Sequence, residues 1–160
     1  MKRRLLLLAL LFSLAGYEVP QPYVIPDGAY GVFQCTALKT TITVPLYTAA
    51  GVGQEVVDAE DSALIRKYGQ GKEICDHADS IIGDGVWNVN DMQVGSTAFL
   101  ITPKHTIHYQ CTAIYLCKQR KYDFTYNGKV IQPTKNDLVC VSCAEDDGWV
   151  YLAYYKRLSN

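Results

Sequence analysis

The chain has 160 residues, of which 49% are hydrophobic and 19% charged. This length suits one folded domain, and the composition excludes a disordered or low-complexity protein. The formal net charge is −1, and the sequence shows no basic stripe, which argues against nucleic-acid binding. The twelve tyrosines favour strands and therefore a β-rich fold.

The N-terminus has the pattern of an export signal. A basic segment, Lys2 to Arg4, precedes the apolar run 5–16, and this order is typical of a secretory signal peptide. The run has about twelve residues, whereas a membrane-spanning helix needs roughly twenty. Residues 1–16 are therefore predicted to be a signal peptide that exports the chain. A short N-terminal anchor, which would associate the protein with a membrane, is the alternative.

The segment after this signal differs from the rest of the chain. Without residues 1–16, twelve basic residues remain against sixteen acidic ones, a net charge of about −4. Residues 17–30 contain Pro20, Pro22 and Pro26, which is typical of an extended, semi-rigid spacer. The folded domain is then expected to span residues 31–160.

The elements expected along this domain are mainly strands. Alternating, β-branched and aromatic residues predict them at 31–38, 40–47, 72–77, 94–101, 106–118, 138–143 and 149–158, with two shorter ones around the Asn127-Gly128 turn. A helix is predicted at 58–68, where Gly69 would end it, and the polar loop 78–90 has room for one helical turn. About eight strands with one or two short helices indicate a mainly β fold, a closed or nearly closed barrel.

Six cysteines follow the signal: Cys35, Cys75, Cys111, Cys117, Cys140 and Cys143. An even number in an exported protein suggests disulfides, but a domain of this length can build its core without them. The count therefore permits disulfides and does not require them. Cys111 and Cys117 lie six residues apart on one predicted strand, so they are expected to share a face as separate core thiols.

Two predicted strands end at residues with catalytic chemistry. His77 ends the strand at 72–77 and Cys143 ends the strand at 138–143, and rigid scaffolds often place reactive groups where a strand meets a loop. The thiolate of a cysteine is the nucleophile, and a neighbouring imidazole can activate it and exchange its proton. His77 and Cys143 are therefore a candidate pair, provided that the fold brings them together.

The same segments resemble bacterial sortases, especially a divergent group from Gram-positive bacteria. The resemblance rests on Ile74-Cys75-Asp76-His77, on the following segments 92–100 and 109–112, and on Leu138-Val139-Cys140-Val141-Ser142-Cys143, which is similar to the Leu-x-x-Tyr/Ile-Thr-Cys signature with serine in place of threonine. It covers roughly residues 35–158. It implies an eight-stranded sortase β-barrel in an exported, cell-surface or secreted protein.

The resemblance also implies an activity and roles for two residues. Cys143 would be the nucleophile and His77 its acid/base partner, in a cysteine transpeptidase or hydrolase that needs no cofactor or metal. The partner would be a peptide or surface protein with a Leu-Pro-x-Thr-Gly-like sorting motif, which forms a thioacyl intermediate. The oligomeric state and the acyl acceptor stay open.

One departure from the family pattern concerns the last strand. The family carries an arginine near its start, whereas this chain has the apolar and aromatic run 149–155 there, and its cations, Lys156 and Arg157, come at the far end. Neither is expected to reach Cys143. Backbone N–H groups near Ala144 would then stabilise the oxyanion, or the activity would be weak.

Other functions remain open at this stage. The domain could be an exported binding module without catalysis, with Cys143 as a structural thiol or half of a disulfide. Alternatively, Cys75, His77, Cys140 and Cys143 could form a four-ligand structural zinc site. Thiol alkylation and a zinc assay distinguish these functions.

Overall fold

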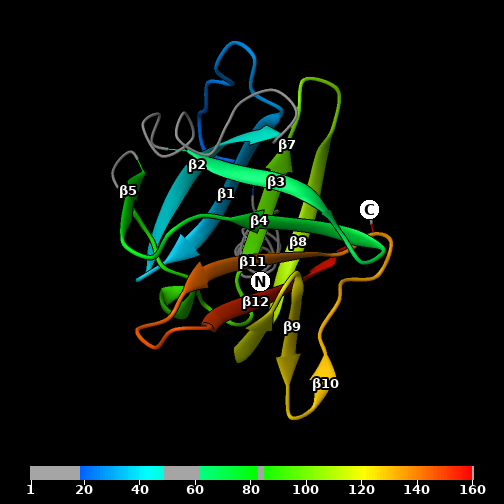
Figure 1. Cartoon of the computed structure of the whole chain (residues 1–160). Helices are drawn as coiled ribbons and strands as arrows, with labels where there is room; N and C mark the ends of the chain where they lie inside the picture. The colour runs from blue at the N-terminus through cyan, green and yellow to red at the C-terminus, as the bar shows by residue number, and fades with distance from the viewer. Residues whose placement is uncertain (1–18, 49–61, 83–84, 160) are drawn as a thin grey trace, which may run out of the picture.

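The computed structural model describes residues 19–48, 62–82 and 85–159, which are built almost entirely from strands (Figure 1). The predicted signal at 1–16 lies outside the described residues. The strands in chain order are β1 Gly31–Ala37, β2 Thr40–Thr48, β3 Ala63–Tyr68, β4 Gly71–Cys75, β5 Ser80–Ile82, β6 Gly85–Trp87, β7 Thr97–Ile101, β8 Thr106–Arg120, β9 Asp123–Tyr126, β10 Lys129–Val130, β11 Leu138–Cys143 and β12 Trp149–Arg157.

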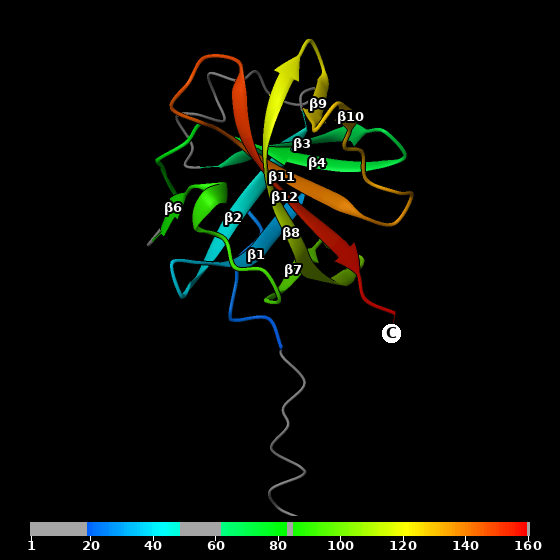
Figure 2. The same cartoon turned by 90° about the horizontal axis from the view of Figure 1, so that it is seen from below.

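The strands close into a barrel. The main sheet has the order β10-β9-β8-β12-β11-β4-β3-β2-β1-β7, and a further pairing of β7 with β8 joins its ends. Eight strands therefore form the ring, which confirms the predicted eight-stranded barrel. The β9–β10 hairpin extends from β8 beyond the ring (Figures 1 and 2). It turns at Asn127-Gly128, both with positive φ, as predicted for this dipeptide.

Alternation along each strand separates an inner core from an outer cluster. On β11, Leu138 and Cys140 belong to the barrel interior, whereas Val139 and Val141 pack on the outer face. The outer cluster is covered by the β9–β10 hairpin, whose Phe124 is 1% exposed. Hydrophobic burial on both faces therefore fixes the register of β11, because a one-residue slip would exchange its two sets of side chains. Cys143 follows in the outer set.

The prediction of a helix at 58–68 is wrong for the residues of this segment that the structure describes. Residues Ala63–Tyr68 form β3, which pairs with β2 in parallel and with β4 antiparallel. Gly69 does not end a helix; it opens the two-residue turn into β4 and has φ +54. Sheet pairing on both sides satisfies the backbone of this segment and overrides its local helix preference. Residues 58–61 lie outside the described residues.

The prediction that Cys111 and Cys117 share one face of their strand is also wrong. Cys111 lies in the barrel interior and Cys117 in the outer cluster. The register between β8 and β12 shifts by one residue, since Tyr154 faces Ala113 and Tyr155 faces Cys111. This β-bulge adds one residue to β8 and reverses the faces beyond it. Both side chains are fully buried core thiols, as predicted.

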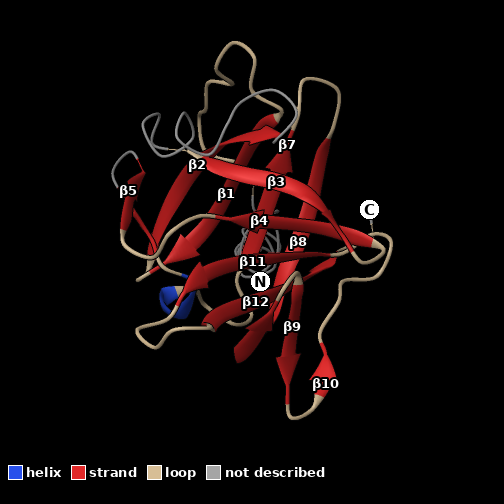
Figure 3. Cartoon of the chain, viewed as in Figure 1, coloured by secondary structure: helices blue, strands red, loops and turns tan. Residues whose placement is uncertain are grey.

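The loop predicted at 78–90 contains more structure than expected. It holds the small β5–β6 sheet and one 3-10 turn, η1, at Val89–Asp91 (Figure 3). Across the described ranges, no helix has the length and apolar character needed to cross a membrane. In residues 19–30, the side chain of Gln34 on β1 exchanges two hydrogen bonds with the backbone of Gln21, so this part of the predicted spacer lies against the barrel.

Candidate active site

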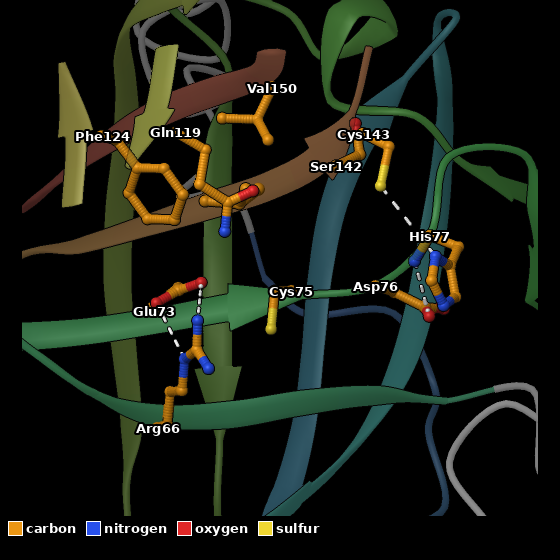
Figure 4. Close-up of a pocket in the computed structure, with 11 residues that line it drawn as sticks. Arg66, Glu73, Cys75, Asp76, His77, Gln119, Phe124, Ser142, Cys143 and Val150 are labelled. Carbon is orange, nitrogen blue, oxygen red and sulfur yellow. Dashed lines mark hydrogen bonds and ion pairs between the residues drawn. The ribbon is translucent and has the colours of Figure 1, made fainter. Parts of the chain in front are cut away.

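The two candidate residues lie at the same edge of the barrel. Strands β4 and β11 are parallel, with Cys75 opposite Val141, so both strands end on the same side. His77 follows β4 and Cys143 ends β11. The Sγ atom of Cys143 lies 3.9 Å from Nδ1 of His77 (Figure 4), which is within reach for a hydrogen bond to sulfur. The structure therefore brings together the two residues that the sequence singled out.

The cysteines differ sharply in accessibility. All six lie in the described part of the chain as free thiols, and Cys143 alone is exposed. Burial, followed by the charge of Glu73, raises the pKa of Cys75 to about 12. Burial also raises the pKa of Cys140 well above its ordinary value. At neutral pH these two thiols are therefore mainly protonated, whereas the thiolate is the nucleophile.

His77 is held by the backbone around Asp76. The carboxylate oxygen Oδ1 of Asp76 accepts a hydrogen bond of 2.8 Å from the His77 N–H. The Asp76 N–H in turn donates to the Val141 carbonyl, at 3.3 Å. Asp76 is 8% exposed. These bonds tie the segment that carries the imidazole to the strand that carries Cys143, so the separation of the two side chains depends on rigid elements.

The strand that carries Cys143 is also supported from the loop side. The indole N–H of the fully buried Trp87 donates to the Val141 carbonyl, at 3.1 Å. The Val89 N–H donates to the hydroxyl oxygen of Ser142, also at 3.1 Å. Ser142 is 1% exposed, and it therefore serves as the buried acceptor that fixes η1 beneath the end of β11.

Cys143 borders two hollows on the surface. The first, here called the thiol pocket, has a volume of about 200 Å³ and includes His77, Cys75, Arg66, Glu73, Gln119 and Phe124 in its lining. The second, here called the loop pocket, has a volume of about 260 Å³ and includes Asp79, Asn88, Glu145 and Tyr151. A single thiol between two hollows can contact one bound group on each side.

The thiol pocket contains an ion pair and an amide at some distance from the thiol (Figure 4). Arg66 donates from Nε and Nη2 to the two carboxylate oxygens of Glu73, at 2.9 Å each. Glu73 is 1% exposed, and the Arg66 side chain 39%. The hydrogen bond to Glu73 raises the pKa of the guanidinium. Gln119, on β8, contributes its side-chain amide to the same lining.

The last strand provides no cation near the thiol, as predicted. Cys143 pairs with Val150, and Arg157 lies seven residues further along β12, which corresponds to about 23 Å. Of the backbone N–H groups near Ala144, that of Ala144 itself donates to the Trp149 carbonyl at 3.0 Å and continues the β11–β12 ladder. It is therefore not free to bind an oxyanion.

The four-ligand zinc site is not formed. Cys140 points into the barrel core, whereas Cys143 is exposed on the outer face, because the two lie an odd number of residues apart on one strand. Within the described ranges, no three His, Cys, Asp or Glu side chains are grouped so that they could hold a metal ion.

Sequence reasoning missed Arg66 and Gln119. Arg66 was placed in a helix, and its partner Glu73 is seven residues away across a turn. The Gly69-Gln70-Gly71 segment was the available signal, since glycines between two apolar runs indicate a hairpin. Gln119 reaches the pocket only because the bulge in β8 reverses the faces of that strand, and no local pattern indicates such a bulge.

Comparison with solved structures identifies the fold as that of sortases. A sortase C from Streptococcus pneumoniae matches with a TM-score of 0.61 and 15% identity, over 96% of this chain and 84% of that one. Sortase C1 from Streptococcus agalactiae matches with a TM-score of 0.59 and 18% identity, over 99% and 88%. A Clostridium perfringens sortase D5 transpeptidase matches with a TM-score of 0.55 and 15% identity, over 81% and 79%. No family model and no curated protein matches the sequence.

Proposed function

We propose that this protein is an exported cysteine transpeptidase of the sortase type, which cuts a peptide carrying a sorting motif and transfers its acyl part to an acceptor. The observation that carries this proposal is the exposed Cys143 thiol, 3.9 Å from the His77 ring nitrogen at the shared edge of β4 and β11. The sortase fold supports it, as does a pocket on each side of the thiol. The signal-like residues 1–16 support export.

The reaction requires His77 to accept and donate a proton in each of its two halves. The Cys143 thiol loses its proton to the imidazole and attacks the scissile carbonyl carbon, so that a carbon–sulfur bond forms. When the carbon–nitrogen bond breaks, the imidazolium protonates the departing amine and a thioester remains. The acceptor then gives a proton to His77 and attacks the thioester, the carbon–sulfur bond breaks, and the released thiolate takes this proton back from His77.

The two pockets suit the two halves of this reaction. The thiol pocket combines the apolar Phe124, Val141 and Val150 with polar groups, as expected for a peptide segment that must be held through the thioester stage. The loop pocket includes Asp79 and Glu145, whose carboxylates attract a cationic amine. We therefore assign the acyl part to the thiol pocket and the acceptor to the loop pocket.

The oxyanion needs a donor that the last strand does not supply. Among the described side chains lining the thiol pocket, those with N–H donors are His77, Arg66 and Gln119. His77 is occupied with proton transfer, and the strand register places Arg66 too far from Cys143 to reach the reacting carbonyl. Gln119 is the remaining neutral donor, and we assign the oxyanion to its amide. Such donors typically contribute 10²- to 10³-fold to kcat.

Turnover of a sorting-motif peptide library, followed by mass spectrometry, tests this function. The wild-type protein should release a fragment cut at one peptide bond, and Cys143→Ala should abolish the release. Cys75→Ala is the matched control, because Cys75 lines the same pocket with a protonated thiol, and this variant should keep the activity. Release that survives Cys143→Ala, or no release from any peptide, contradicts the proposal.

A further inference from the structure

We infer that the Arg66–Glu73 pair is a remote subsite that binds a carbonyl oxygen of the acyl-side peptide, about four residues from the bond that is cut. This inference deepens the proposed function and rests on it. Its first support is that Arg66 and Glu73 line the same hollow as Cys143 and His77, although they lie on different strands from Cys143 and are bound to each other.

The strand register gives the distance between this pair and the thiol. Arg66 lies opposite Glu73 on β4, and Glu73 lies opposite Val139 on β11. Cys143 is four residues further along β11, about 13 Å in the strand direction, and β3 also lies two strand spacings, about 9.5 Å, to the side of β11. An arginine side chain cannot cross this distance to act on the reacting carbonyl. An extended peptide that runs along the pocket, however, advances by about the same distance per residue as strand β11. The fourth residue on the acyl side of the scissile bond would therefore reach Arg66.

The chemistry of the pair determines what it can bind. Glu73 takes two of the five N–H donors of the guanidinium, and the described part of the chain shows no further acceptor for the others. The pair has no net charge, and the buried carboxylate of Glu73 would repel a second carboxylate. A neutral acceptor such as a peptide carbonyl or a side-chain amide oxygen avoids this repulsion and still receives charge-assisted hydrogen bonds.

Glu73 explains why an arginine stands at this position. A carboxylate that is 1% exposed needs a partner, and a bidentate pair also fixes the plane of the guanidinium. Its remaining donors therefore keep one direction along the pocket. A lysine would neutralise Glu73 as a point charge and would not provide this fixed geometry.

The experiment measures equilibrium binding, so that it does not depend on turnover. In the Cys143→Ala background, fluorescence polarisation compares two labelled peptides. One carries a complete Leu-Pro-x-Thr-Gly-like motif with five residues on the acyl side of the scissile bond, and the other is the same peptide truncated to two residues on that side. We expect the longer peptide to bind about tenfold more tightly, which is the contribution of one hydrogen bond to a charged group.

Two variants remove the subsite in different ways. Arg66→Met combined with Glu73→Gln leaves no buried charge, and Arg66→Lys keeps the charge while losing the forked donors. Both should reduce the preference for the longer peptide to less than about twofold and leave binding of the shorter one unchanged. Lys67→Met is the matched control. Lys67 is the cation next to Arg66 on β3, and its side chain points to the other face of the strand. This variant should keep the preference for the longer peptide.

Two results would overturn the inference. One is that both Arg66 variants keep the whole preference for the longer peptide. The other is that these variants lose the same factor of affinity for the longer and the shorter peptide. Failure of the proposed function looks different, because the wild-type protein then cuts neither peptide, whatever the binding preference is.

Discussion

Tyr68→Phe should loosen the β9–β10 hairpin that forms one wall of the thiol pocket. The Tyr68 hydroxyl donates to the Ile131 carbonyl at 2.8 Å and accepts from the Phe124 N–H at 3.3 Å. The substitution keeps the ring, which stacks edge-on against Phe124 at a centroid distance of 5.2 Å. It removes both hydrogen bonds and leaves the buried N–H without its acceptor. The expected loss of unfolding free energy is about 2 kcal/mol.

Urea unfolding followed by circular dichroism measures this loss, and the melting temperature should fall by about 4–8 °C. Hydrogen exchange should become faster in the hairpin before it does so in the barrel strands. Tyr122→Phe is the matched control, because this tyrosine lies in the turn between β8 and β9, is 77% exposed and should change stability by less than about 0.5 kcal/mol. An equally small change for Tyr68→Phe would refute the claim that its hydroxyl anchors the hairpin.

Three further predictions concern the oxyanion, the support of β11 and alkaline stability. Gln119→Leu should lower kcat about 10²-fold with little change in KM, and a loss below about threefold in steady-state kinetics would exclude Gln119 as the oxyanion donor. Ser142→Ala should cost about 1–3 kcal/mol in urea unfolding, because it leaves the buried Val89 N–H without an acceptor, whereas Ser142→Thr keeps the oxygen and should cost less. Burial raises the pKa of Cys35 and Cys140 in the folded state, so each thiol contributes stability that is fully present below about pH 8.5 and falls by about 1.4 kcal/mol per pH unit above it. Urea midpoints that stay constant from pH 7.5 to 10.5 would contradict this last prediction.

Local patterns were sufficient where a strand has a regular period or a specific turn. The strand at 138–143 was predicted with the bounds that the structure shows. The Asn127-Gly128 turn was predicted because this dipeptide accommodates two consecutive positive φ angles. The mainly β character of the domain followed from such elements. In each of these cases the information lies within a few neighbouring residues.

Features that depend on pairing between distant segments could not be predicted in the same way. The segment at 63–68 has a helix-compatible pattern, and only its two strand partners make it β3. The juxtaposition of His77 and Cys143 requires β4 and β11 to pair in parallel, and the spacing of 66 residues alone does not imply it. The resemblance to sortases supplied that pairing. The bond between the Ala144 N–H and Trp149 shows that a backbone donor at a strand end can already be used by the ladder.

The central claim is that Cys143 becomes acylated. The most direct measurement is intact-protein mass spectrometry during turnover of a sorting-motif peptide, followed by peptide mapping of the modified residue. We predict an added mass equal to the acyl fragment, located on Cys143 and released by hydroxylamine, with much slower formation in His77→Ala. An acyl group on Cys75, or peptide cleavage by the wild-type protein without any adduct on Cys143 under quenched conditions, would contradict it.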